Sequence, residues 1–135
     1  MSRKGNHQRT IFLIEEDNET RPLLKANLER DGYRVIVALG EEDALERVGG
    51  GQVPADLVLI NLVGTSAEEA LEAGRRVRKH AKYNGHTPLV VMAEKYGEDL
   101  EGTDVNVEGN DWITYLEDHG QLENLLARLL EGLAD

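Results

Sequence analysis

Short apolar runs alternate with longer amphipathic stretches along this sequence, and that alternation limits the folds it can adopt. The runs read TIFLI, YRVIVAL, DLVLI, PLVVMA and WITYL, at residues 10–14, 33–39, 56–60, 88–93 and 112–116. Their short length and their β-branched and aromatic residues are typical of buried strands. The third run is apolar almost throughout, which indicates a central strand of a parallel sheet that is covered on both faces.

The stretches between these runs have the spacing of amphipathic helices. We predict helices from Asp17 or Asn18 to Gly32, over residues 41–48 and over residues 67–82. A last helix is indicated by leucines that recur at spacings of three and four, because this spacing places them on one helix face. These leucines are Leu122, Leu125, Leu126, Leu129 and Leu133.

Strands that alternate with helices predict right-handed crossovers and a parallel sheet with helices on both sides. The number of such units in 135 residues fits a flavodoxin-like, doubly wound α/β fold. This fold has five parallel strands in the order 2-1-3-4-5 and three layers, α/β/α. We assign residues 1–9 to a flexible, basic N-terminal tail and residues 10–133 to a single domain.

One stretch interrupts the pattern. Residues 97–109 stand where the fourth helix belongs, yet they include three glycines together with Thr103, Val105 and Val107. Glycine and β-branched residues are poor helix formers. We therefore expect a short, distorted or mobile element there.

The net charge of −11 argues against binding to nucleic acid or to an anionic membrane, because an acidic surface repels both. A basic group at Arg75, Arg76, Arg78 and Lys79 falls in a predicted helix, where we expect a solvated face. The absence of cysteine excludes thiolate metal sites and cysteine nucleophiles. No apolar run approaches the ~20 residues of a membrane-spanning helix, so we expect a cytoplasmic domain.

In doubly wound sheets, ligands bind at the carboxyl ends of the strands. The residues at these ends are Glu15 and Glu16 after the first strand, Asn61 after the third, Ala93 after the fourth and Tyr115 in the fifth. Any chemistry of this domain is expected at these positions.

The order and spacing of several segments resembles the receiver domain of two-component response regulators, the CheY-like family. The segments are IFLIEEDNETRPLLKANLERDGYRVIVA, EEDALERV, PADLVLINL, TPLVVMAE and NDWITYL. The likeness covers about residues 10–130. It implies the flavodoxin-like fold and a role in a phosphorelay, where a receiver reports to a histidine kinase, an output domain or another receiver.

A working receiver of that family uses five residues, and this sequence departs from them at decisive positions. By resemblance, the acidic pair that helps bind Mg²⁺ corresponds to Glu15 and Glu16, and the phosphoacceptor aspartate corresponds to Asn61. The hydroxyl residue corresponds to Ala93, and the lysine that pairs with the phosphate corresponds to Tyr115. An amide is not a phosphoryl nucleophile, alanine has no hydroxyl, and tyrosine carries no cation at neutral pH.

The sequence therefore predicts a degenerate receiver that is not an enzyme and needs no cofactor. We expect it to act by phosphorylation-independent contacts with a protein partner, without binding nucleic acid or membrane by itself. The candidate contact residues are Tyr96, Trp112 and Tyr115. A homodimer through the final helix is an alternative use of the same side of the domain.

Two other functions stay open. Phosphoryl or metal chemistry could persist at an unorthodox site, with a weak Mg²⁺ or Ca²⁺ ion held by Glu15, Glu16 and the Asn61 carbonyl. Alternatively, the vacated pocket could bind a small ligand, since the carboxyl ends of the strands are the usual ligand site of this architecture.

Overall fold

The computed structural model describes residues 8–51, 53–83, 86–94 and 96–131. Helices and strands alternate through most of this length. In chain order they are β1 (Thr10–Glu15), α1 (Thr20–Arg30), β2 (Arg34–Ala38), α2 (Glu41–Gly50), β3 (Leu57–Asn61), α3 (Ala67–His80), β4 (Leu89–Met92), β5 (Asp104–Glu108), β6 (Asp111–Thr114) and α4 (His119–Glu131).

The strands form one sheet in the order β2-β1-β3-β4-β6-β5. The first five strands in this order run parallel to one another. They reproduce the predicted order 2-1-3-4-5 when β6 is counted as the fifth strand, so the flavodoxin-like fold is confirmed. The remaining strand, β5, pairs antiparallel with β6 at the edge of the sheet.

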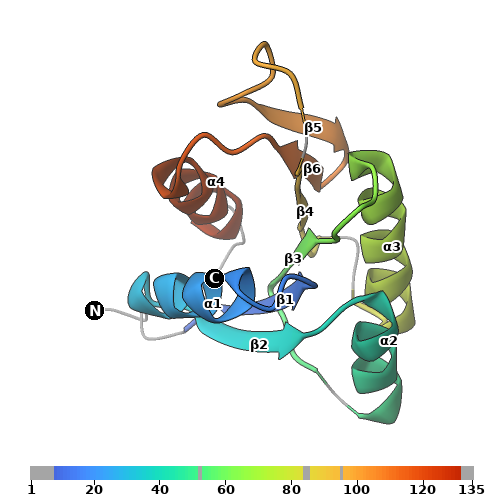
Figure 1. Ribbon diagram of the computed structural model, residues 1–135. Coiled ribbons are helices and arrows are strands. Elements are labelled where there is room, and N and C mark those ends of the chain that lie inside the picture. Colours follow the sequence, from blue (N-terminus) through green and yellow to red (C-terminus); the bar gives the residue numbers. More distant parts are fainter. Residues whose placement is uncertain (1–7, 52, 84–85, 95, 132–135) are drawn as a thin grey trace.

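Helices cover both faces of the sheet, with α1 and α4 on one side and α2 and α3 on the other (Figure 1). Successive residues of a strand point to opposite faces. Phe12 and Ile14 of β1 therefore pack in the core under α2 and α3. Ile11 and Leu13 of the same strand pack in the core under α1 and α4.

Helix α3 lies close to the sheet at Gly74. A Cβ atom at this position would lie 2.5 Å from Cδ1 of the buried Leu89 in β4, so the glycine permits the close approach. Glycine inside a helix costs about 1 kcal/mol relative to alanine. A capping box at the start of α3 offsets part of this, because Ser66 Oγ accepts from the Glu69 amide and the Glu69 side chain accepts from the Ser66 amide.

The segment at the fourth-helix position contains a strand, and this corrects the predicted count of five strands to six. A turn over residues 98–102 leads into β5. Gly102 and Gly109 flank this strand with φ angles of 86° and 53°, in the left-handed region that glycine adopts without strain. Val105 and Val107 favour the extended backbone because they are β-branched. The expectation of a poor helix is confirmed, but the segment extends the sheet.

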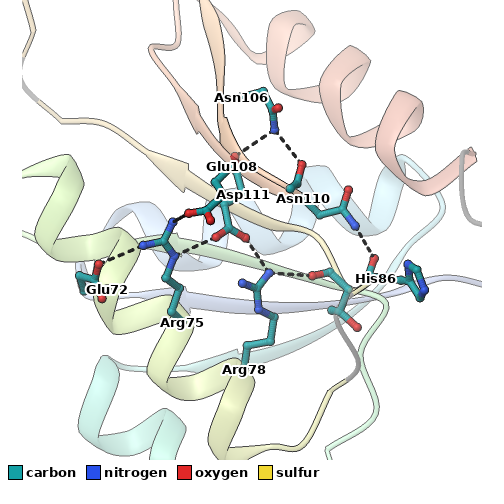
Figure 2. Close-up of polar contacts among 10 residues, drawn as sticks. Glu72, Arg75, Arg78, His86, Asn106, Glu108, Asn110 and Asp111 are labelled. Carbon is teal, nitrogen blue, oxygen red and sulfur yellow. Dashed lines mark hydrogen bonds and ion pairs between the residues drawn. The ribbon is translucent and has the colours of Figure 1, made fainter.

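A buried carboxylate ties the β5–β6 hairpin to α3. Asp111, only 5% exposed, is paired with Arg75 Nε at 2.8 Å and with Arg78 Nη1 at 2.7 Å (Figure 2). Arg75 also reaches Glu108 at the end of β5, at 3.6 Å. Arg78 donates to the carbonyl of Thr87 at 3.0 Å, just before β4. Asp111 of β6 thus holds two arginines of α3, which in turn reach the end of β5 and the residue before β4.

The prediction that the basic residues of α3 form a solvated face is wrong for Arg75 and Arg78, whereas Arg76 is exposed as predicted. Arg75 and Arg78 neutralise Asp111, and Arg76 donates to Glu41 of α2 through Nε and Nη2 at 2.5 and 3.0 Å. These pairs join α3 to β6 and to α2, so the arginines do not form a free cationic surface.

Part of the predicted tail and of the last helix lies outside the described residues, namely residues 1–7 and 132–135. Gln8 and Arg9, also assigned to the tail, contact the domain. The Gln8 side chain donates to the Gly32 carbonyl at 3.2 Å, and the Arg9 carbonyl accepts from the Arg34 amide at 2.9 Å. No helix among the described residues is long and apolar enough to cross a membrane.

Replacing Asp111 by alanine is expected to lower the free energy of unfolding by about 3 kcal/mol, because two arginines lose their shared counter-charge in a poorly solvated place. Urea denaturation followed by circular dichroism measures the change. The matched control is Asp99→Ala in an exposed turn, which should change the free energy of unfolding by less than about 0.5 kcal/mol. Equal stabilities of the two variants would show that the cluster does not hold the hairpin.

Candidate functional site

The predicted site residues lie along the carboxyl edge of the sheet, and the structure brings two of them into direct contact. Glu15 and Asn61 are register partners at the ends of β1 and β3. The Asn61 amide Nδ2 donates to Glu15 Oε2 at 2.8 Å, and the Asp17 main-chain amide donates to the same oxygen at 3.1 Å. Asn61, which the resemblance sets at the phosphoacceptor position, therefore has its amide nitrogen engaged by the carboxyl group of Glu15.

The carboxyl group of Glu15 is enclosed by protein. Glu15 is 0% exposed, and this burial raises the pKa of its carboxyl group above the usual value. The hydrogen bonds from Asp17 and Asn61 act in the opposite direction but are the smaller effect. Glu15 Oε1 and Asn61 Oδ1 are both buried without a hydrogen-bond partner. A neutral Glu15 could satisfy both atoms at once, because an acid O–H on Oε1 can donate to an amide carbonyl.

Glu16 points elsewhere, toward the loop that follows β3. Its Oε1 accepts from the Val63 amide at 2.7 Å. A Cβ atom at Gly40 would lie 3.2 Å from Glu16 Oε2, so the loop after β2 approaches this carboxylate closely. The two glutamates thus serve separate hydrogen bonds at the edge of the sheet.

This arrangement does not fit a magnesium ion. Mg²⁺ demands octahedral oxygen ligands and usually keeps several waters. Here the two unpartnered oxygens, Glu15 Oε1 and Asn61 Oδ1, are closed off from solvent, and Glu16 is engaged by Val63. Among the described residues, no group of three or more His, Cys, Asp or Glu side chains could hold a metal ion.

Ala93 and Tyr115 lie at the ends of the neighbouring strands β4 and β6. The Ala93 amide donates to the Thr114 carbonyl at 3.0 Å, which continues the sheet without adding a side-chain donor. The Tyr115 ring packs edge-on against Tyr96, with ring centroids 5.5 Å apart and planes at 76°. The Tyr96 hydroxyl donates to the carbonyl of Leu116. The two tyrosines therefore pack against each other at the end of β6.

A cavity of about 440 Å³ opens beside Ala93, between the end of β4 and the loop that leads into α3. Glu94 reaches across it toward this loop, where its Oε1 lies 3.5 Å from the Gly64 amide. The cavity is lined by Val63, Gly64, Thr65, Ser66, Ala67, Ala93 and Glu94.

Arg21, which the sequence did not single out, is a cation at this edge. Its Nε donates to the Glu15 carbonyl at 2.9 Å and its Nη2 to the Glu16 carbonyl at 3.4 Å, while Asn18 Oδ1 accepts from both terminal nitrogens. Main-chain and amide oxygens thus occupy this guanidinium. Its place in the first turn of α1, close to the acidic pair, was the available signal.

Trp112, the third candidate contact residue, faces the other side of the sheet from Tyr115. It is partly buried against the core under α1 and α4, whereas Tyr115 packs against the core under α2 and α3. The guanidinium of Arg128 from α4 lies 5.9 Å from its ring centroid, and its Nε1 is buried without a partner. The predicted contact residues therefore belong to two surfaces.

No protein-family model matches the chain. Among curated proteins, the chain is similar to the uncharacterized transcriptional regulatory protein YkoG of Bacillus subtilis, with 26% identity over 123 residues. This match covers 91% of the chain and 50% of that protein, so the chain spans half the length of its curated relative.

Solved structures of response regulators share the fold. A response regulator receiver protein from Sinorhizobium medicae has a TM-score of 0.69 at 16% identity, covering 93% of this chain and 97% of that one. The response regulator TrrA of Thermotoga maritima, solved in complex with Mg²⁺-BeF, has a TM-score of 0.63 at 20% identity, covering 90% and 99%. The chain therefore has the fold of CheY-like receiver domains.

Glu15→Gln is expected to stabilise the protein at neutral pH by about 1 kcal/mol, because a neutral amide can accept from Asn61 Nδ2 and donate to Asn61 Oδ1. Since the pKa of Glu15 is raised by folding, its ionisation destabilises the folded state as pH rises above the ordinary value of 4.5. The advantage of the variant should therefore vanish below that pH, where the carboxyl is protonated in both states.

Thermal unfolding at a series of pH values measures this difference. Glu46→Gln, on the exposed side of α2, is the control and should show no such pH-dependent gain. A Glu15→Gln variant that is less stable than the unmodified protein at neutral pH would mean that the ionised carboxylate is needed at this position.

Proposed function

We propose that this domain is a degenerate receiver of a two-component or phosphorelay system, which acts through protein contacts without being phosphorylated. The observation that carries the proposal is the Glu15–Asn61 pair. At the position where similar receivers hold their phosphoacceptor, an amide donates to a buried glutamate at 2.8 Å. An amide nitrogen engaged in this way offers no nucleophilic oxygen to a phosphoryl group.

The neighbouring side chains support the same proposal. Phosphoryl transfer requires cationic or metal partners for the charge that develops on the phosphoryl oxygens. Tyr115 supplies no such charge and is braced by Tyr96, and Ala93 supplies no hydroxyl. Among the described residues of this edge, Arg21 is a cation, and it donates to main-chain carbonyls and to Asn18. The described side chains of the pocket thus offer neither a phosphoryl acceptor nor a free charge clamp.

A receiver without this trigger presents a constant surface to its partner. Phosphorylation switches act by adding charge that biases a bistable element. Because the acceptor position is engaged inside the protein, the partner would bind the surface that the folded domain already presents, without a preceding conformational switch. The partner classes that the fold suggests are a histidine kinase, an output domain or another receiver, and the domain itself is not an enzyme.

A small-ligand sensor is the second candidate function, and the cavity beside Ala93 favours it. Its volume of about 440 Å³ falls within the usual range of small-molecule sites. A metabolite bound there would contact Glu94 and the loop before α3. In an amide spectrum, ligand-induced shifts confined to residues 63–67 and 93–94 would support this reading.

The main proposal predicts that beryllofluoride, which mimics an acyl phosphate, will not bind in the presence of Mg²⁺. In ¹H–¹⁵N spectra, the amides of Glu16, Asn61, Ala93 and Tyr115 should not move, because the acceptor oxygen and the metal site are missing. TrrA, which was solved with Mg²⁺-BeF, is the positive control under the same conditions. Saturable shifts at these amides, spreading to Trp112 and α4, would show that the domain is a working switch.

A further inference from the structure

We propose that β5 is a docking edge, to which an extended, basic segment of a partner protein adds as a further strand of the sheet. This inference deepens the proposed function by naming a surface and the chemistry of its partner. It rests on the proposed function only in taking protein contact as the mode of action.

Within the described part of the chain, no strand lies on the outer side of β5. The sheet order ends at β5, which pairs there with β6 (Figure 1). Hydrogen-bonded and non-hydrogen-bonded pairs alternate in an antiparallel ladder. The Tyr115 amide donates to the Thr103 carbonyl at 2.9 Å, which makes Thr103 and Tyr115 a hydrogen-bonded pair. Because the pairs alternate, Asp104 and Asn106 belong to non-hydrogen-bonded pairs, and their main-chain groups point away from β6. These outward groups are available to another strand.

The edge is also preformed. Asp104 Oδ1 accepts from Thr114 Oγ1 at 2.7 Å and from Gln121 Nε2 at 2.8 Å, which joins the start of β5 to β6 and α4. The Asn106 side chain donates to the carbonyls of Gly109 and Asp111 at 3.0 and 3.2 Å, which closes the hairpin (Figure 2). A strand held in this way loses little further conformational freedom when a partner strand is added.

The usual protection of sheet edges is weak here. Natural edge strands are blunted by proline, by lysine, by bulges or by a covering element. The strand reads DVNVE and contains neither proline nor lysine, but its pairing is irregular between Asn106 and Glu108, so the regular part of the edge is Asp104–Asn106. Val105 and Val107 remain 40% and 44% exposed, so apolar surface accompanies the free main-chain groups. These features match the sites used by strand addition.

Charge decides the kind of partner. Both carboxylates of the strand have contacts within the domain, but they differ in exposure. Asp104 is engaged by Thr114, Gln121 and Arg128, and its side chain is 17% exposed. Glu108 reaches Arg75 only at 3.6 Å, and its side chain is 80% exposed, so Glu108 is the charge that a partner meets. In an antiparallel pairing of two copies centred on Asn106, Asp104 of each would face Glu108 of the other, and a parallel pairing would set like residues side by side. Like charges opposite each other destabilise a sheet, which disfavours a second copy of this acidic chain. A segment that alternates lysine or arginine with apolar residues can pair a cation with the exposed Glu108 and apolar side chains with the two valines.

The test uses the full chain labelled with ¹⁵N and a synthetic peptide that alternates lysine and valine. We expect saturable shifts of the amides of residues 104–108 and slower hydrogen exchange at Asp104 and Asn106. A control peptide with a central valine replaced by proline has the same charge but cannot extend the ladder, so it should not slow exchange. Glu108→Gln should raise the Kd of the lysine–valine peptide about fivefold, as expected for one lost surface ion pair.

Three outcomes would overturn the proposal. The lysine–valine peptide could leave residues 104–108 unaffected, or the proline peptide could bind as well, which would indicate a purely ionic contact. Concentration-dependent shifts of β5 without any peptide would assign the edge to a second copy of the chain. None of these outcomes bears on the beryllofluoride experiment, so failure of the docking edge and failure of the proposed function are distinguishable.

Discussion

The central strands of this protein are apolar on both faces, and the rest of the structure follows from the need to shield both faces from solvent. Every residue of β1 from Ile11 to Ile14 and of β3 from Leu57 to Ile60 is fully buried. A sheet of this kind has no face that can meet water, so helices must cover both sides. The crossover connections place α1 and α4 on one side and α2 and α3 on the other. Polar function is thereby restricted to the ends and edges of the sheet.

At the carboxyl edge, that restriction explains the character of the candidate site. Glu15 belongs to a strand whose other residues are core, so its carboxyl group is desolvated and needs a partner within the protein. Asn61 supplies this partner from the adjacent strand. An aspartate at the same place would set two carboxylates side by side, a repulsion that a receiver with a metal ion can relieve. The amide of Asn61 avoids this repulsion by donating a hydrogen bond to Glu15.

Most of the fold could be predicted because strand and helix signals agree with tertiary structure for the buried elements. The apolar runs identify each parallel strand, and the leucine spacing identifies α4 on the face where it packs. The strand at Asp104–Glu108 could not be predicted, because its residues are half polar and its pairing with β6 depends on the turn at Gly109.

The site residues could be named from their strand-end positions, but their contacts could not. The Glu15–Asn61 contact, the role of Arg21 and the pairing of Asp111 with two arginines are side-chain geometries. No periodicity in the sequence reports them.

The two structural features that support the proposed function are consistent with each other in physical terms. A receiver that responds to phosphate needs an accessible acceptor and a surface that can change. In this chain, the amide of Asn61 is engaged by Glu15 inside the protein. The segment that would be the fourth helix is instead a strand, and Asp111, Glu108 and Asp104 connect it to α3, β6 and α4. Such a surface is held by several independent contacts, so a single added charge has little to displace. Recognition by a preformed edge requires no displacement, and for that reason a constant sheet edge suits the phosphorylation-independent mode of action that we propose.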